Sequence, residues 1–259
     1  MDLELTERVV LITGGSSGIG LAAAQVLLAE GARVGICGRD ANRLEQAAHD
    51  LGHHDQLLSH QGDVLSADDM AQFVAAVADR WGGVDGLVNN AGQSRMSTYA
   101  TTSDDEWREE LNLKFFGLLN PTRAAESALR ESSVGTVVNI NAVLSRQPEG
   151  RLVATSAARA GALNLTKSLS VELAPDVRVN SVLLGLIDTG QWRRRYDTAE
   201  TDQTYEEWSA ELAADRGIVL GRLGRADEVA PVIATLLSPR AGYVTGTTIE
   251  VAGGVSRGV

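Results

Sequence analysis

The stretch Arg8–Gly20, RVVLITGGSSGIG, decides the fold of this chain. It begins with a β-branched, apolar run typical of a buried strand and ends where an Ala-rich helical pattern starts. The glycines between them permit a tight turn and a close approach of the backbone to a ligand. Free N–H groups and the dipole at a helix N-terminus attract negative charge. A glycine-rich turn in this position therefore predicts a site for the pyrophosphate of a dinucleotide.

The same strand-and-helix pattern continues outward from this turn. Short β-branched runs alternate with longer Ala/Leu-rich stretches, as expected of βαβ units around a buried parallel sheet. The predicted strands are Arg8–Thr13, Arg33–Cys37, Gln56–Gln61, Val84–Asn89, Gly135–Ile140, Val177–Leu183 and Thr247–Val251. The predicted helices are Ile19–Glu30, Ala41–Leu51, Ala67–Arg80, Asp104–Arg130, Leu152–Leu173 and Ala226–Leu237. We predict one α/β domain over residues 1–259, with a doubly wound, parallel seven-stranded sheet and helices on both faces.

Composition limits the classes of partner. The chain has 259 residues, 44% of them hydrophobic, and a formal net charge of -11. Because phosphate backbones are held chiefly by excess Lys and Arg, this charge argues against a nucleic-acid partner. The sole cysteine, Cys37, cannot form an intramolecular disulfide, and the opening MDLELTERVV lacks the features of a secretion signal. No apolar run is long enough to cross a bilayer. We expect a cytoplasmic protein with no membrane partner and no metal site.

Residues 188–217 depart from the alternating pattern. This stretch is strongly charged, with Arg193–Arg195 followed by Glu200, Asp202, Glu206, Glu207 and Glu211. In a doubly wound sheet, an excursion after a late strand lies near the carboxyl edge, where ligands bind. We predict a substrate lid at 188–217, and a solvated surface insertion stays open as the alternative.

Further motifs give the chain a resemblance to the short-chain dehydrogenase/reductase family. The turn follows the pattern Thr13-Gly14-x-x-x-Gly18-x-Gly20, and the fourth predicted strand ends in Asn89-Asn90-Ala91-Gly92, as in that family. The other matches are Asp63-Val64, Val179-Asn180, Gly185, Ile187-Asp188-Thr189 and Val244-Thr245-Gly246. The resemblance covers essentially the whole chain and implies a Rossmann-type fold. It also implies a nicotinamide cofactor bound by Gly14, Ser16, Ser17, Gly18, Ile19, Gly20, Arg39, Asp63, Val64, Asn90, Ala91, Gly92, Arg159, Ile187 and Thr189.

The end of the second predicted strand bears on which cofactor is bound. An acidic residue there would hydrogen-bond the ribose 2′-hydroxyl of NAD, whereas a nearby Arg accommodates the 2′-phosphate of NADP. Gly38 stands where NAD-using members carry Asp, and Arg39 follows it. We therefore predict NADP(H) in preference to NAD(H). Two alternatives stay open. Arg39 could instead pair with Asp40 or stack on the adenine, and both cofactors could bind, since Ser17 is not the second basic residue of many NADP-binding relatives.

The chain departs from the family at the catalytic positions. Relatives use a Ser, a Tyr, a Lys four residues after the Tyr, and an Asn on the preceding long helix. By resemblance, Ala142 stands at the Ser position, Thr155 at the Tyr position and Arg159 at the Lys position. Asn112 is identified as the surviving Asn. The candidate catalytic residues are therefore Asn112, Thr155 and Arg159.

These substitutions weaken the predicted proton transfer. An aliphatic hydroxyl is far less acidic than a phenol, and a guanidinium is a poor proton donor. Cofactor binding should survive better than catalysis, because a positioned acid or base typically contributes on the order of a hundred- to ten-thousand-fold in rate. Candidate replacements, each with a packing or surface role as its alternative, are Tyr196, Tyr99, Ser94, Arg95 and Asn141.

Three functions are compatible with the sequence. The first is an oxidoreductase on a small carbonyl or alcohol, with proton delivery by water or by a lid residue. The second is a non-catalytic NADP(H)-binding sensor or the inactive subunit of a hetero-oligomer. The third is a different reaction, such as an elimination, which no residue specifically favours. We prefer the oxidoreductase by fold-level analogy. The resemblance further implies a homo-oligomer, a tetramer or dimer, formed through helices Asp104–Arg130 and Leu152–Leu173.

Overall fold

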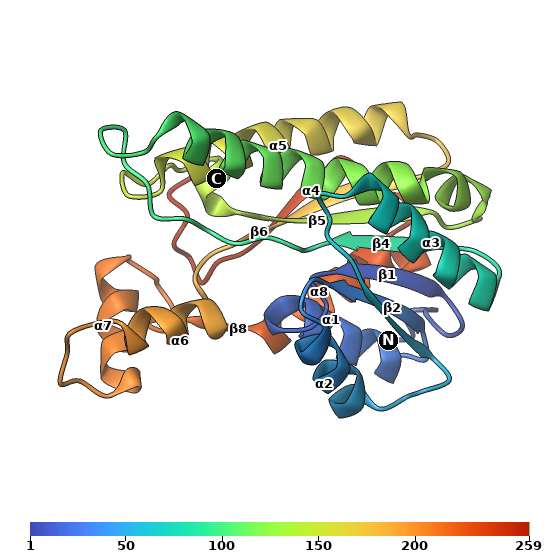
Figure 1. Ribbon diagram of the computed structural model, residues 1–259, viewed down its shortest axis with the longest axis horizontal. Helices are drawn as coiled ribbons and strands as arrows, with labels where there is room; N and C mark the ends of the chain where they lie inside the picture. Colours follow the sequence, from blue (N-terminus) through green and yellow to red (C-terminus); the bar gives the residue numbers. More distant parts are fainter. Residues whose placement is uncertain (259) are drawn as a thin grey trace.

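The computed structural model describes residues 1–258 and contains the predicted parallel sheet (Figure 1). The strands are β1 Val9–Thr13, β2 Arg33–Gly38, β3 Leu57–Gln61, β4 Gly86–Asn89, β5 Thr136–Ala142, β6 Arg178–Leu184 and β9 Thr248–Val251. They lie in the order β3-β2-β1-β4-β5-β6-β9, and every neighbouring pair is parallel. The order reverses between β1 and β4, which is where doubly wound sheets bind ligands. The prediction of a seven-stranded Rossmann-type sheet is confirmed.

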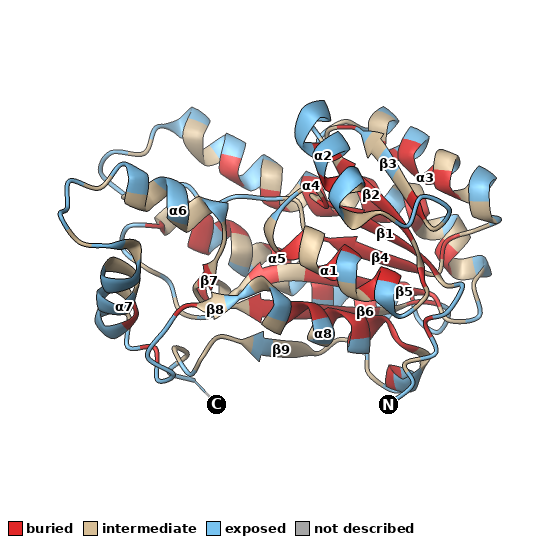
Figure 2. Cartoon of the chain, turned by 90° about the horizontal axis from the view of Figure 1, so that it is seen from below, coloured by how far each residue is buried: buried red, intermediate tan, exposed pale blue. Residues whose placement is uncertain are grey.

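Helices cover both faces of this sheet (Figures 1 and 2). One face carries α1 Gly18–Ala29, α2 Ala41–Leu51 and α8 Ala226–Leu237. The other carries α3 Ala67–Trp81, α4 Asp104–Glu131 and α5 Val153–Glu172. Two short 3-10 helices, η1 Val143–Ser145 and η2 Pro239–Ala241, complete this part of the chain. Strands covered on both faces bury every side chain, which explains why β1 is continuously apolar.

Buried polar groups hold the carboxyl ends of the central strands in place. Thr13 Oγ1, at the end of β1, accepts a hydrogen bond of 3.1 Å from the backbone N–H of Asn90. Asn89 Nδ2, at the end of β4, donates to Asn139 Oδ1 at 2.8 Å and to Thr122 Oγ1 at 3.0 Å. These bonds join the glycine turn, β4, β5 and α4 into one rigid edge.

Residues 188–217 contain two helices that the sequence analysis did not predict, α6 Gly190–Asp197 and α7 Tyr205–Asp215. They form one end of the molecule (Figure 1, left), and many of their residues are exposed (Figure 2). Strands β7 Ile187–Asp188 and β8 Gly224–Arg225 pair in parallel at their base. Aromatic rings pack between the two helices, among them Tyr196 and Trp208 with centroids 5.7 Å apart. The segment is therefore a small packed unit with its own aromatic cluster.

No helix within residues 1–258 has the length and apolar character needed to span a membrane.

Candidate functional site

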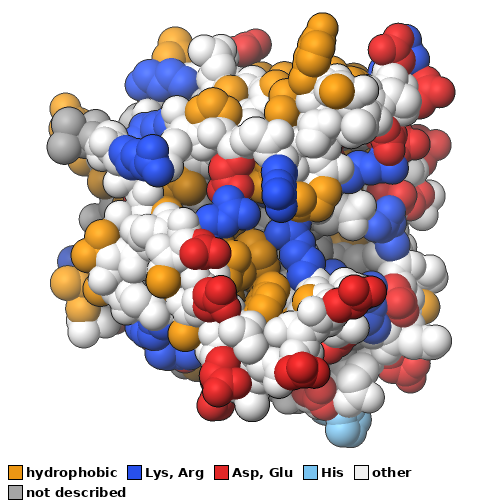
Figure 3. All heavy atoms as spheres, turned by 90° about the vertical axis from the view of Figure 1, so that its left-hand side faces the viewer, with side chains coloured by type: hydrophobic (Ala, Val, Ile, Leu, Met, Phe, Trp, Pro, Cys, Tyr) orange, Lys and Arg blue, Asp and Glu red, His pale blue; other side chains and the backbone are white. Residues whose placement is uncertain are grey.

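A cavity of about 880 Å³ lies at the carboxyl edge of the sheet. The glycine turn, the ends of β2, β4, β5 and β6, and helix α6 all contribute to its wall. Figure 3 views the end of the molecule that carries α6 and α7, and it shows a hollow with hydrophobic side chains at its floor and charged side chains around it. This volume lies in the range of small-molecule and cofactor sites.

The structure brings the predicted cofactor residues together at this cavity, with one exception. Those on its wall are Gly14, Ser16, Ser17, Gly18, Ile19, Arg39, Asp63, Val64, Asn90, Ala91, Gly92, Arg159, Ile187 and Thr189. Gly20 does not line it. A Cβ atom at Gly20 would lie 2.3 Å from the carbonyl oxygen of Gly14, so this glycine allows the turn to pack against α1.

The turn between β1 and α1 has the conformation that a phosphate group requires. Gly14 and Gly18 have φ values of +68° and +55°, which residues other than glycine rarely adopt. A Cβ atom at Gly14 would also approach the Cα of Ala91 to 2.9 Å. Ser17, the residue before α1, makes no side-chain hydrogen bond to the helix. The first N–H groups of α1 are thus left for an anion, and the site fits a dinucleotide pyrophosphate.

Arg39 lies where a 2′-phosphate would be recognised. Its alternative partner, Asp40, instead accepts hydrogen bonds from the backbone and the side chain of Arg43, at 3.0 and 3.1 Å. Within residues 1–258, Arg39 forms no ion pair. Arg43 also lines the cavity, so it supplies a second basic residue that the sequence analysis did not identify. The alternative in which Arg39 pairs with Asp40 is therefore not seen in this structure.

A buried ion pair lies between α4 and the cavity. Lys114 Nζ and Glu110 Oε1 are 2.8 Å apart, with side chains only 7% and 4% exposed. Lys114 Nζ also donates to the carbonyl oxygen of Gln93 at 2.6 Å, and an ammonium group carries a third N–H. Burial, followed by the nearby charge of Arg159, lowers the pKa of Lys114 to about 8, against the opposing effect of Glu110. Lys114 lines the cavity, so a tunable proton donor is present there.

Thr155 faces the ion pair and does not line the cavity. Its side chain is fully buried, and its hydroxyl donates to Glu110 Oε1 at 2.8 Å and accepts from the backbone N–H of Arg95 at 3.3 Å. The hydroxyl at the family's Tyr position is therefore committed to holding Glu110. It lacks the reach and the direction to act on a substrate.

Arg159 lies on the cavity wall beside Asn141. Its Nη1 is 3.4 Å from Asn141 Oδ1, and Asn141 Nδ2 donates to the backbone oxygen of Arg159 at 3.0 Å. The Nε of Arg159 is buried and has no partner within residues 1–258. Burial lowers the pKa of Arg159 to about 10. The group is still a cation at neutral pH and lies on the cavity wall.

The structure contradicts the assignment of Asn112. This side chain is exposed and is not part of the cavity wall, whereas Lys114, two residues later, is buried and lines it. Two residues along an α-helix correspond to a rotation of about 200°, so the two side chains lie on nearly opposite faces of α4. The i, i+4 spacing of Glu110 and Lys114 was the sequence signal that pointed to the inward face.

The structure places some of the other candidate replacements on the cavity wall and others away from it. Ser94 and Asn141 line the cavity. Arg95 forms ion pairs with Glu106 and Glu109 instead. Tyr99 is 88% exposed, and the Tyr196 hydroxyl donates to the backbone oxygen of Gln203 inside the α6–α7 unit. Neither tyrosine replaces the missing one in this structure.

Comparisons with known proteins identify the family. The model of the short chain dehydrogenase family matches residues 8–200. An uncharacterized oxidoreductase of Mycobacterium bovis is 35% identical over 96% of this chain and 97% of its own length. The chain therefore belongs to the short-chain dehydrogenase/reductase family.

The chain is also similar to solved structures of oxidoreductases. A short chain oxidoreductase from Pseudomonas aeruginosa PAO1, described as containing an atypical catalytic center, is 45% identical in its apo form, with a TM-score of 0.93 and coverage of 97% of this chain and 98% of that one. Its NADPH-bound form is 44% identical with a TM-score of 0.93, covering 98% and 100%. L-sorbose reductase from Gluconobacter frateurii, solved with NADPH and L-sorbose, is 28% identical with a TM-score of 0.95 and full coverage of both chains.

Proposed function

We propose that this protein is an NADP(H)-dependent oxidoreductase that reduces a small carbonyl compound, with Lys114 as the proton donor. The observation that carries the proposal is the buried ammonium group of Lys114 on the wall of a cavity that also holds the phosphate-binding turn. The NADPH-bound relative from Pseudomonas aeruginosa supports the choice of cofactor. Arg39 and Arg43 on the cavity wall support it independently.

The side chains present can perform the proton-transfer half of a carbonyl reduction. A bound reduced nicotinamide would supply a hydride to the carbonyl carbon. Lys114 Nζ then gives its proton to the carbonyl oxygen, and the product is the alcohol. A pKa of about 8 keeps Lys114 protonated at neutral pH while making it a stronger acid than an ordinary lysine. A protonated Lys114 can therefore act as the acid that carbonyl reduction requires.

Arg159 and Glu110 have supporting parts in this proposal. The cationic side chain of Arg159 on the cavity wall would stabilise the negative charge that develops on the carbonyl oxygen. Glu110 fixes the ammonium of Lys114, and Thr155 fixes Glu110 in turn. A buried pair held on several sides keeps its geometry without reorganisation, which is what electrostatic catalysis requires.

A small polar cavity beside Lys114 supports a proposal for how its proton is restored. A second cavity, of about 30 Å³, adjoins Lys114 and Arg159 behind the main one, and its wall includes the amides of Asn89, Asn139 and Asn141. This is enough space and polarity for a single water. We propose that such a water returns a proton to the neutral amine of Lys114 after each turnover.

Two successive titrations test the proposed function. The protein is first titrated with NADPH and with NADH while cofactor fluorescence is followed, and carbonyl compounds are then added to the NADPH complex. We expect tighter binding of NADPH and faster loss of its absorbance than in protein-free samples. Tight binding without any turnover would favour the non-catalytic sensor, and no binding of either nucleotide would refute the cofactor assignment.

A further inference from the structure

The wall of the main cavity carries more positive than negative side chains, although the chain as a whole is acidic. Seven cationic residues line the cavity: Arg39, Arg43, Lys114, Arg159, Arg194, Arg195 and Arg216. Only three acidic residues do so: Asp40, Asp63 and Glu149. The whole chain carries a formal charge of -11, so the cavity is a local reversal of sign. A cleft of this kind concentrates anionic ligands.

Arg194, Arg195 and Arg216 are the cationic lining residues left when the proposed cofactor residues and proton donor are set aside. Arg194 is exposed, whereas Arg195 and Arg216 are partly buried and lie near the same carboxylate, that of Glu149. Arg216 forms an ion pair with Glu149, and both side chains are partly buried. Arg195 has no ion-pair partner within residues 1–258, and its guanidinium stacks 4.6 Å from the centre of the Trp192 ring. Burial and the nearby charge of Arg216 lower the pKa of Arg195. The carboxylate of Glu149 therefore lies near both guanidinium groups, those of Arg195 and Arg216.

These two arginines lie next to the reacting end of the cavity. Glu149 pairs with Arg216, and its backbone N–H donates a hydrogen bond to Ser156 Oγ at 3.3 Å. Ser156 directly follows Thr155, which holds the Glu110–Lys114 pair. Glu149 thus connects Arg216 to the first turn of α5, the same turn that carries Thr155.

We propose that Arg195 and Arg216 bind a carboxylate or phosphate group carried by the carbonyl substrate, so that the natural substrates are oxo acids or phosphorylated ketones. This inference rests on the proposed carbonyl reduction. An anion beside Arg195 would supply the missing counter-charge, and guanidinium groups bind both carboxylates and phosphates through paired N–H donors. Trp192, on the same wall, would cover the apolar part of such a substrate.

The test compares charged and neutral forms of the same carbonyl compounds. The probes are pyruvate, acetoacetate and levulinate with their methyl esters, and dihydroxyacetone phosphate with dihydroxyacetone. We expect Arg195→Gln to lower kcat/KM for the preferred acid about 10- to 100-fold, the usual effect of removing a hydrogen bond to a charged group, and to change kcat/KM for its ester less than about twofold. The oxo acids and the phosphate ester distinguish the two kinds of anion.

Arg193→Gln is the matched control. Arg193 is on the same helix and carries the same charge, but it pairs with Asp188 and does not line the cavity. We expect this variant to retain the wild-type preference for acids over esters. Equal losses in the two variants would show a general charge effect and overturn the inference.

A calorimetric titration separates this inference from the proposed function. Each acid is titrated into the protein saturated with NADP⁺, which needs no turnover. Binding of an acid that Arg195→Gln weakens supports the anion site even if no carbonyl is reduced. Turnover of neutral esters as fast as of the acids, or the absence of any Arg195-dependent binding among the four anions, overturns the anion site and leaves the proposed reduction standing.

Discussion

At the scale of single residues, the chemistry of the site depends on how Glu110 and Lys114 are held. The two side chains are one helical turn apart on the buried face of α4, and a third group, Thr155 from α5, completes the set. A lone buried lysine would lose its charge, and a lone buried glutamate would bind a proton. Because they are paired, the lysine stays charged at neutral pH but gives up its proton more readily than in water.

Replacing Lys114 tests its part in the reaction. We expect Lys114→Met to lower kcat for carbonyl reduction by about a hundred- to ten-thousand-fold, because a positioned general acid contributes this much. Steady-state kinetics with NADPH provide the measurement. The NADPH dissociation constant of the variant is the control and should stay close to that of the wild type. A variant that binds NADPH normally and keeps wild-type kcat would refute the role of Lys114.

Thr155 is expected to behave differently, since its hydroxyl contacts Glu110 and not the cavity. Thr155→Val has a similar shape and removes the hydrogen bonds that the hydroxyl makes with Glu110 and with the backbone N–H of Arg95, neither of which involves the substrate, so we expect kcat to fall about tenfold or less. The same kinetic assay measures this. A loss as large as that of Lys114→Met would instead mean that the hydroxyl takes part directly in proton transfer.

Arg39 tests the choice of cofactor. Arg39→Gln removes a guanidinium from the predicted 2′-phosphate site, and a charge-assisted hydrogen bond of this kind is worth about 10- to 100-fold in affinity. We expect the NADPH dissociation constant to rise by that factor, while the NADH constant changes less than about twofold. Fluorescence titration gives both constants. Equal weakening of the two cofactors would place Arg39 against the adenine instead.

Sequence reasoning succeeded and failed at the site for identifiable physical reasons. The glycine turn could be predicted because its spacing between a strand and a helix is unusual and its backbone conformation needs glycine. The choice between Asn112 and Lys114 could not be settled by motif matching, since both stand in the stretch Glu110–Lys114. Their difference lies in which face of α4 is buried, and that depends on packing against α5.

At the scale of elements, the strands of the sheet could be predicted from the sequence, whereas two of the helices could not. The central strands β1 and β4 were predictable because burial on both faces favours apolar runs, whereas β3 alternates between buried and more exposed residues. Helices α6 and α7 were missed because their charged residues suggested a solvated loop. The capping box formed by Thr204 and Glu207 was a local signal for the start of α7. Their aromatic residues, such as Trp208, supply the packing that stabilises them.

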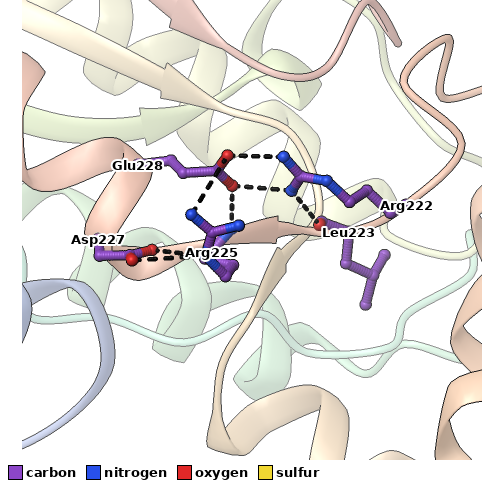
Figure 4. A network of polar contacts seen from close by, with 5 residues as sticks. All are labelled: Arg222, Leu223, Arg225, Asp227 and Glu228. Atoms are coloured by element: carbon purple, nitrogen blue, oxygen red, sulfur yellow. Dashed lines mark hydrogen bonds and ion pairs between the residues drawn. The ribbon is translucent and has the colours of Figure 1, made fainter.

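The start of α8 has a charge network that includes Arg222 from the segment before β8 (Figure 4). Arg222 contacts both carboxylate oxygens of Glu228, at 2.6 and 2.8 Å, and the backbone N–H of Arg225 donates to Glu228 Oε2 at 2.8 Å. The side-chain bond from Arg222 and the backbone bond from Arg225 lower the pKa of Glu228 to about 2. The carboxylate therefore stabilises the fold when ionised.

Glu228→Gln should show this stabilisation in its pH dependence. A folded-state pKa of about 2 against an ordinary value of 4.5 means that the contribution is complete above pH 4.5 and is lost as the pH falls from there toward 2. We expect a lower Tm than the wild type at neutral pH and a difference that shrinks below pH 4.5, measured by circular dichroism. Glu45→Gln, at an exposed carboxylate without an ion pair within residues 1–258, is the control. A constant difference across this pH range would contradict the account.

At the scale of the whole molecule, several large apolar side chains are exposed, and three of them lie on the long helices α4 and α5. Leu111 and Phe116 belong to α4, and Val171 belongs to α5. We propose that these helices pair between subunits, as expected of a homotetramer or homodimer in this family. Light scattering should then give a mass that is a multiple of 27.4 kDa, and Phe116→Glu should reduce it. A wild-type monomer would contradict this prediction.

The whole account depends on Lys114 as the proton donor, and a pH profile tests that claim most directly. We would measure kcat/KM for NADPH-dependent carbonyl reduction from pH 6 to pH 10 in the wild type and in Lys114→Met. The account predicts a wild-type decline as the pH rises through about 8, because the free protein then loses the proton of Lys114, and no such decline in the variant. The same decline in both proteins, or a flat wild-type profile through pH 8, would contradict it.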